Sequence, residues 1–255
     1  LGRQKQRAQA SAGKAQLQQQ QQRARLDEQV RQAAAQVDAA APVVLLPAVD
    51  AGPAPARVAV LQDVVLPFVD GPLARIDLLL GRGERLALTG RNGSGKSVLL
   101  QVLAGRLPAR GGRVQVNAPH AWLDQHLSLP LPQATALEQL RHAGPSTGEA
   151  ELRTRLALLG LDAGHAGQPL AALSGGERMK LALACALYAQ PPAQLLLLDE
   201  PANHLDLEAM QALEALLRQW PGTLLVAAHD EAFLHGIGIT GRLHAGTGGW
   251  CRLPP

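Results

Sequence analysis

Hydrophobic residues recur at two different spacings along the chain, and the spacing changes near residue 57. In the first part, one narrow helical face carries Leu26, Val30, Ala33 and Val37. Because an α-helix repeats about every 3.6 residues, this spacing predicts a helix with one thin apolar stripe. Such a stripe is too narrow to support a core, so the helix needs a partner or stands in solvent. The Pro- and Ala-rich AGPAPA (51–56) then predicts a connector.

From Arg57 onward, short apolar runs bounded by Gly and Pro alternate with longer helical patterns. Strands are predicted for RVAVLQDVVLPF (57–68), RIDLLLGRGERLALTG (75–90), LLLLD (195–199) and TLLVAAHD (223–230). Helices are predicted for SVLLQVLAGRL (97–107), the segment 127–173, LALACALYAQ (181–190) and DLEAMQALEALLRQW (206–220). Strands that alternate with helices indicate an α/β fold, with a mostly parallel sheet covered on both faces.

Composition narrows the class of protein. Apolar residues make up 47% of the 255 residues and aromatic ones only 2%, so a core has to be built from Leu, Val and Ala. Cys185 and Cys251 form no C-x-x-C pair, which argues against a disulfide framework or a zinc site and fits a reducing cytoplasm. No apolar run approaches the roughly 18 residues that span a bilayer. We therefore expect a cytoplasmic protein without membrane insertion, and the start at Leu1 suggests a fragment of a longer chain.

The net charge of +3 is spread unevenly. Residues 1–36 contain seven Arg or Lys against Asp27 and Glu28, so the remainder is mildly acidic. A basic arm on an acidic globular part indicates an anionic partner, such as nucleic acid or a membrane surface. The arm has no aromatic residue to stack on bases, which suits contact with a phosphate backbone rather than sequence readout. A solvated helix that is basic by chance remains the alternative.

A phosphate-binding loop is predicted at GRNGSGKS (90–97), which matches G-x-x-x-x-G-K-[ST] between a predicted strand and a predicted helix. The ATP-binding residues expected here are Gly90, Arg91, Asn92, Gly93, Ser94, Gly95, Lys96, Ser97 and Val98. The glycines let backbone N–H groups turn inward around phosphates, and the helix start adds a positive dipole. Lys96 would reach the β- and γ-phosphates, and the Ser97 hydroxyl would bind Mg²⁺.

Two carboxylates follow the apolar run LLLL, in LLLLDE (195–200). Asp199, at the end of the predicted strand, can hold Mg²⁺ directly or through water, and Glu200 is placed to polarise an attacking water. A leucine run that ends in acids is weak evidence alone. It becomes strong when it follows a phosphate-binding loop by about a hundred residues.

The sequence LSGGERMK (173–180) places Ser-Gly-Gly before a helix. The residues of interest are Leu173, Ser174, Gly175, Gly176 and Glu177. Ser174 could cap the helix, and the exposed N–H groups would then bind an anion. The alternative is an ordinary capping box between Ser174 and Glu177 without a ligand, and spacing alone leaves both open.

Taken in order, these motifs resemble those of ATP-binding cassette (ABC) ATPase domains. The ordered set is GRNGSGKS, Gln125, LSGGE, LLLLDE, NHLD (203–206) and His229. The resemblance covers residues 57–255 and implies a P-loop NTPase of the ABC type, with ATP and Mg²⁺ as ligands. It also implies a mixed sheet core, a small antiparallel β subdomain and a helical subdomain at about 127–180, preceded by a linker helix.

Roles for further residues follow from this resemblance. In such domains the Gln125 position links Mg²⁺ and water to the neighbouring domain, and the LSGGE position contacts the nucleotide that a partner cassette holds. The His229 position forms a hydrogen bond with the γ-phosphate. Taken alone, the alternative for His229 is a surface histidine near a strand end. The positions that couple the two sites across a cassette pair are Asn203, His204, Leu205 and Asp206.

Some positions depart from the family pattern. Phe68 stands where the family usually has Tyr under the adenine, and packing of Phe68 in a strand is an equal alternative. Trp122 is interpreted as a core residue. The family often has Thr where Val98 and Ala202 stand, but neither position supplies an essential group, so inactivity does not follow.

Several features resemble the second cassette of ABC-F proteins, in which a basic helical linker joins two cassettes. They are NHLD, WLDQH (122–126) and HDEAFLHGIG (229–238), the short span from Gln125 to Ser174, and the lack of membrane segments. Residues 1–56 would then be the end of that linker with its connector, and 57–255 the second cassette. The resemblance implies another cassette as partner, from the missing N-terminal half or a second copy, and action on the ribosome or tRNA. The alternatives are the ATPase subunit of a membrane transporter and a non-hydrolysing regulatory cassette.

Overall fold

The computed structural model describes residues 54–161, 163–203 and 205–255. The predicted linker helix and most of the connector lie outside the described residues, so they stay predictions.

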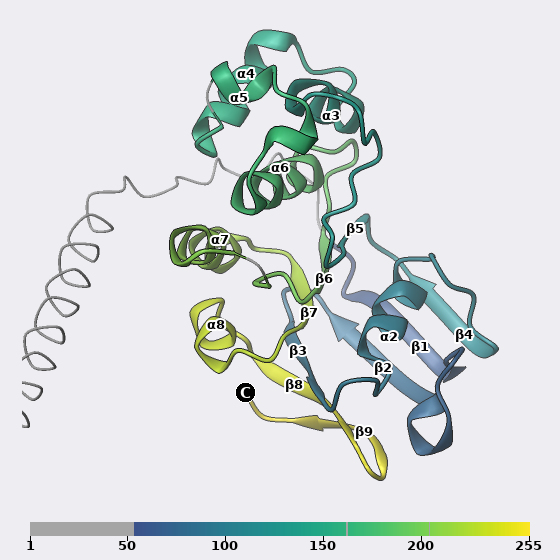
Figure 1. The fold of residues 1–255 in the computed structure, drawn as a ribbon. Coiled ribbons are helices and arrows are strands. Elements are labelled where there is room, and N and C mark those ends of the chain that lie inside the picture. Colours follow the sequence, from purple (N-terminus) through teal and green to yellow (C-terminus); the bar gives the residue numbers. More distant parts are fainter. Residues whose placement is uncertain (1–53, 162, 204) are drawn as a thin grey trace, which may run out of the picture. The chain divides into compact units, whose positions relative to one another are not determined.

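A six-stranded sheet forms the centre of the described chain, in the order β5-β6-β7-β3-β8-β9 (Figure 1). Its strands are β3 (Arg85–Gly90), β5 (His120–Leu123), β6 (Leu195–Asp199), β7 (Thr223–Ala227), β8 (Gly241–Gly246) and β9 (Gly249–Leu253). The neighbouring strands pair in parallel, except that β9 pairs antiparallel with β8. The expectation of a mostly parallel, mixed sheet is therefore confirmed.

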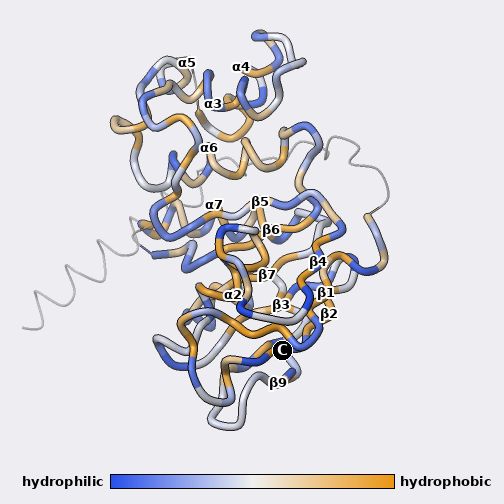
Figure 2. Tube along the Cα trace, turned by 90° about the vertical axis from the view of Figure 1, so that its right-hand side faces the viewer, coloured by the Kyte–Doolittle hydropathy of each residue, from blue (hydrophilic) through white to orange (hydrophobic). Residues whose placement is uncertain are grey.

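Strand β6 shows why this sheet is covered on both faces. Its residues are all buried, and alternate side chains of a strand point to opposite faces. Leu196 and Leu198 belong to the hydrophobic cluster on one face, whereas Leu195 and Leu197 belong to the cluster on the other. A continuous apolar run is what a central strand of a parallel sheet requires. Figure 2 shows hydrophobic residues concentrated along these central strands.

A smaller antiparallel sheet lies beside the central one, in the order β2-β1-β4. Its strands are β1 (Arg57–Val65), β2 (Arg75–Gly81) and β4 (Gly111–Val116). Helix α2 (Lys96–Leu103) contacts β4 of the small sheet as well as β6 and β7 of the central one. It ends four residues before the predicted end, because Gly105 adopts φ +67° and the helix cannot continue through that conformation.

The part of the sequence between β5 and β6 forms a group of helices that stands apart from the strands (Figure 1). Its members are α3 (Ala136–Ala143), α4 (Glu149–Leu158), α5 (Ala163–Ala166) and α6 (Gly175–Leu187). The prediction of helix from residue 127 was wrong for its first part, since no helix begins before Ala136. Pro130 and Pro132 lie in this irregular segment, and proline removes the backbone donor that a helix interior needs.

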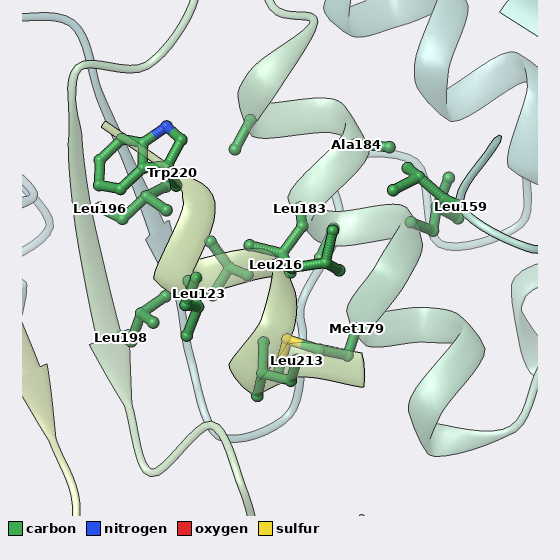
Figure 3. Packing of buried hydrophobic residues seen from close by; sticks show 14 of the residues in the cluster. Leu123, Leu159, Met179, Leu183, Ala184, Leu196, Leu198, Leu213, Leu216 and Trp220 are labelled. Atoms are coloured by element: carbon green, nitrogen blue, oxygen red, sulfur yellow. The ribbon is translucent and has the colours of Figure 1, made fainter. Parts of the chain in front are cut away.

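Helices α7 (Leu207–Gln219) and α8 (Glu231–Gly236) complete the fold. Figure 3 shows side chains of α6 and α7 meeting those of β6 in one hydrophobic cluster, including Met179, Leu216 and Leu198. Gly176 permits this close packing, since a Cβ there would lie 2.6 Å from the Cβ of Ala209 on α7.

Arg85, the first residue of β3, connects this strand to the C-terminal ends of α7 and α8. Its guanidinium donates to the carbonyl oxygen of Trp220 at 2.9 Å and to those of Leu217 and Ile237 at 2.5 and 2.7 Å. A cation near helix C-termini satisfies carbonyl groups that have no partner within the helix. Strand β3, which leads into the predicted phosphate-binding loop, is therefore anchored to α7 and α8.

Candidate functional site

The predicted phosphate-binding loop lies between the end of β3 and the start of α2. Gly90 and Gly95 have φ of +127° and +97°, a region that other residues avoid. A Cβ on Gly90 would lie 2.7 Å from the carbonyl oxygen of Ala245, and one on Gly95 would lie 2.8 Å from Val69. Both the backbone conformation and the surrounding space therefore require glycine, as the motif predicts.

Lys96 begins α2 and folds its side chain back under the loop. The Nζ atom donates to the carbonyl oxygens of Gly90 at 2.9 Å and Arg91 at 3.1 Å, and the residue is 7% exposed. Burial lowers the pKa of the Lys96 ammonium, while the nearby carboxylates of Glu200 and Asp199 raise it. The ammonium is thus held at the loop, where an entering phosphate would meet it.

The Ser97 hydroxyl donates to Oδ1 of Asp199 at 3.0 Å. Asp199 ends the buried strand β6, and burial raises the pKa of its carboxyl, against the lowering effect of the Ser97 hydrogen bond and Lys96. Hydroxyl and carboxylate oxygens are the ligands that Mg²⁺ prefers. Among the described residues no group of three or more His, Cys, Asp or Glu could hold a metal. The hydroxyl of Ser97 and the carboxylate of Asp199 fit Mg²⁺, an ion that takes its other ligands from water and phosphate.

Glu200 and His229 lie opposite each other beyond the ends of β6 and β7. Oε1 of Glu200 lies 3.3 Å from Nε2 of His229. The backbone of Glu200 has φ +48°, and its N–H donates to the carbonyl oxygen of Ala227 at 2.8 Å. Burial raises the pKa of the Glu200 carboxyl, while His229 and Lys96 lower it. A carboxylate in such surroundings has the character of a general base.

Lys96, Ser97, Glu200 and His229 line one cleft of about 580 Å³, whereas Asp199 is buried behind Ser97 and is not part of the lining. Its lining residues are Phe68, Val69, Asn92, Gly93, Gly95, Lys96, Ser97, Val98, Gln125, Glu200, Asn203 and His229. The cleft brings together predicted site residues that lie far apart in the sequence. The predicted metal ligand Gln125 is exposed and lines this cleft, two residues after the end of β5.

Phe68 lies in a turn beyond the end of β1, at φ +60°, and it is 77% exposed. This excludes the alternative that its ring packs in a strand. An exposed ring at the cleft is available to stack on a base, which an aromatic face favours. Trp122, on β5, is half-buried against the core, with the Arg106 guanidinium 5.9 Å from its ring centroid.

The LSGGE residues do not line this cleft. Ser174 caps α6, its Oγ accepting from the Glu177 amide at 3.3 Å, while Glu177 Oε2 accepts from the Ser174 amide at 2.7 Å. The capping box is therefore present, and Ser174 and Gly175 are exposed to solvent. The hydrogen bond from the Ser174 amide is the main reason that the pKa of Glu177 is lowered.

The predicted coupling loop lies between β6 and α7. Asn203 lines the cleft, and its amide donates to the Glu200 carbonyl at 3.1 Å. Leu205 is half-buried against the core, and Asp206 caps α7 by accepting from the Ala209 amide at 2.8 Å. His204 lies outside the described residues.

Two contributions to the site were missed from the sequence. Val69 packs against Gly95, and His165, on α5, places Nε2 2.9 Å from Oε1 of Glu177. His165 lies twelve residues before Glu177 in a segment without a recognisable motif. Only the folded chain could reveal this pair.

Comparison with known proteins identifies the family of this chain. Residues 73–203 match the protein family described as "ABC transporter". The putative ATP-binding protein YdiF of Bacillus subtilis is 36% identical over 181 residues, which cover 69% of this chain and 28% of that protein. The ATP-binding protein Uup of Escherichia coli is 38% identical over 164 residues, covering 60% of this chain and 25% of that protein. The chain thus spans about a quarter of the length of these relatives.

Solved structures share the fold. A dimeric post-hydrolysis state of the ATP-binding cassette MJ0796, bound to ADP and Pi, superposes with a TM-score of 0.63 at 23% identity. The match covers 77% of this chain and 98% of that cassette. None of the helices in the described part of the chain is long and apolar enough to cross a membrane. The chain belongs to the ATP-binding cassette family, and its relatives support its assignment as an ABC-F cassette.

Proposed function

We propose that this chain binds ATP with Mg²⁺, hydrolyses the terminal phosphoanhydride bond, and works as one of two paired cassettes. The observation that carries the proposal is the cleft of about 580 Å³ beside the phosphate-binding loop. The cleft brings together the ammonium group of Lys96 and the hydroxyl group of Ser97. It also contains the carboxylate of Glu200, which faces the imidazole of His229. The dimeric state of MJ0796, with its products ADP and Pi, is consistent with the reaction and with pairing.

In this proposal the loop binds the phosphates by charge and backbone donors. The Lys96 ammonium exchanges the carbonyl groups of Gly90 and Arg91 for phosphate oxygens, which are stronger acceptors. Ser97 and Asp199 would hold the Mg²⁺ ion, which supplies neutralisation of the phosphate charge. The exposed ring of Phe68 stacks on the adenine.

Glu200 acts as the general base. Burial raises the pKa of its carboxyl, which makes the carboxylate a better proton acceptor than an exposed one. It takes a proton from the water that attacks the γ-phosphorus, and the bond to the bridging oxygen of ADP breaks. His229, 3.3 Å from Oε1, fixes the carboxylate and donates to the γ-phosphate.

The position of LSGGE supports the proposal of pairing. Its residues are absent from the cleft, and its Ser174 and Gly175 are open to solvent. In the proposal they bind the γ-phosphate of a nucleotide held by another cassette, with helix N–H groups and the dipole of α6 as the attraction. The partner is the remaining part of a longer protein, or a second copy of this chain.

We further propose that closure of the paired cassettes acts on the ribosome in the cytoplasm. The support is the basic segment 1–36 and the ABC-F relatives. The alternatives of a transporter ATPase subunit and a non-hydrolysing cassette give different results in the experiments below.

The decisive variant is Glu200→Gln in the full-length protein. We expect ATP binding to persist and turnover to fall by about 100-fold, because the base is lost while the shape is kept. The control Glu151→Gln changes an exposed carboxylate on α4, outside the cleft, and should leave turnover unchanged. Equal turnover in the Glu200→Gln and native proteins would remove Glu200 from this role, and no turnover in the native protein would favour the regulatory alternative.

The ribosome step is tested by sedimenting Glu200→Gln protein with ribosomes, with and without ATP. Cosedimentation that needs ATP and weakens steeply with salt is expected for a phosphate contact. Recovery with membranes instead would support the transporter alternative, and absence from the ribosomal fraction in all conditions would contradict the ribosome step.

A further inference from the structure

A second cavity, of about 200 Å³, lies between β5, α3 and α6, and it shares no lining residue with the cleft at the phosphate-binding loop. Small side chains on α6 leave room for it, since Ala182, Cys185 and Ala186 line one side. Leu123 of β5 and Leu129 add apolar surface. An apolar cavity of about 150 Å³ is enough to hold a benzene ring. The space therefore admits a small molecule with an apolar body.

Two of the residues that line this cavity each carry a buried polar atom without a hydrogen-bond partner in the described part of the chain. Nε1 of Trp122 is a donor, and Oε1 of Gln139 is an acceptor. Gln139 is 1% exposed, and its Nε2 donates to the carbonyl oxygen of Leu131. Because a buried polar group without a partner is unfavourable, these two atoms favour a ligand that brings one acceptor and one donor.

The charged residues at this cavity are all basic. Arg106, His120 and His142 are exposed there, and none of them has an ion-pair partner among the described residues. No Asp or Glu occurs in the described lining, and burial raises the pKa of the Cys185 thiol to about 12, so it stays uncharged at neutral pH. The Arg106 guanidinium lies 5.9 Å from the centroid of the Trp122 ring. A permanent cation and an unpaired indole donor therefore belong to neighbouring side chains, which suits a carboxylate.

We propose that this cavity binds a small apolar carboxylic acid that carries one N–H or O–H group on its apolar body. The body lies against Ala182 and Ala186 of α6. The carboxylate accepts from the Arg106 guanidinium and from Nε1 of Trp122, and the N–H or O–H group donates to Oε1 of Gln139. The inference does not depend on ATP hydrolysis, since the two linings have no residue in common.

Indole-3-acetate is the probe, because it has a flat apolar body, a carboxylate and one N–H group. Calorimetric titration of the nucleotide-free, full-length protein should show saturable binding. Tryptamine, which has an ammonium group in place of the carboxylate, should bind at least about tenfold more weakly, and 1-benzothiophene-3-acetate, which lacks the N–H, about threefold to tenfold more weakly. The proposal is overturned if indole-3-acetate shows no saturable binding up to about 10 mM, or if either analogue binds as well.

Variants of the protein locate the binding site. Arg106→Gln removes the exposed cation and should weaken binding of indole-3-acetate by about tenfold. The matched control is Arg113→Gln, which changes an exposed arginine of β4 outside the lining and should leave the affinity unchanged. Ala186→Leu fills the cavity and should abolish binding, with the melting temperature showing whether this variant folds. Native affinity in Arg106→Gln would mean that the probe binds elsewhere, whatever the stability of Ala186→Leu.

Discussion

At the scale of single residues, the site is a cluster of charges that the fold takes out of water before any ligand arrives. Asp199 and Glu200 both have a raised pKa, with burial as the largest cause, although the Lys96 ammonium is close to both. The folded protein therefore disfavours their ionised forms relative to the unfolded chain. Groups arranged for binding and chemistry commonly cost stability in this way.

This predicts that Asp199→Asn raises the midpoint of thermal unfolding at neutral pH. The amide keeps an oxygen that accepts from Ser97 and removes a disfavoured charge. A carboxyl whose pKa is raised on folding gives stability at low pH, and that stability is lost as the pH rises through the folded pKa. The advantage of the variant should therefore shrink as the pH falls through the raised pKa of the native Asp199 carboxyl, where that carboxyl becomes protonated.

Scanning calorimetry of nucleotide-free protein at pH 7.5 and at lower pH measures this difference. Asp70→Asn is the control, because Asp70 is exposed and its side chain does not cap η1 (Gly71–Ala74). A lower midpoint for Asp199→Asn at neutral pH would contradict the prediction.

At the scale of elements, two helices begin with the same chemistry but are expected to differ in use. Ser174→Ala and Thr135→Ala each remove the acceptor of a capping box, at α6 and α3 respectively. Each should lower the free energy of unfolding by about 0.5–2 kcal/mol. Only Ser174→Ala should also lower ATP turnover, because Ser174 is proposed to face the partner's nucleotide.

Urea unfolding gives the stability of each capping variant, and steady-state ATP hydrolysis by the full-length protein gives its turnover. Equal effects of the two substitutions on turnover would reduce Ser174 to an ordinary helix cap.

The packing of α6 against α7 gives another prediction. Gly→Ala within a helix ordinarily stabilises it, but at Gly176 the new Cβ would lie 2.6 Å from that of Ala209. The two helices must then move apart, so Gly176→Ala should cost about 1–3 kcal/mol of unfolding free energy. Gly167→Ala is the control, since no atom lies within 4 Å of a Cβ at that position. Denaturant titration that finds Gly176→Ala as stable as the native protein would contradict the close approach.

At the scale of the whole molecule, the proposal that LSGGE acts on a partner's nucleotide predicts that ATP turnover depends on pairing. For the isolated 255-residue chain, turnover per chain should rise with protein concentration until pairing is complete. Rates measured at a fixed, saturating ATP concentration test this, with Glu200→Gln giving the background. A rate per chain that does not vary with concentration, above that background, would show that one chain forms a complete site.

The sequence allowed much of this molecule to be predicted where short-range chemistry decides. The glycines around Lys96 and the leucines of β6 are local requirements of a loop and a buried strand, so their spacing could be read directly. The two-sheet architecture came from resemblance, because no local pattern tells that β3 lies between β7 and β8. The exposure of Phe68 and the contact of His165 with Glu177 depend on tertiary packing, which leaves no trace in spacing.

The central position of β3 bears on the order in which the protein becomes competent during its synthesis. Residues 85–90 leave the ribosome well before both neighbouring strands, β7 and β8, which come from residues 223–246. Until those are made, the strand that carries the phosphate-binding loop has two unpaired edges, and such edges associate readily with other chains. His229 and the carbonyl group of Ile237, which accepts from Arg85, are made in the same interval. The proposed ATP site can therefore form only after the segment 223–246 has been made and has folded against β3.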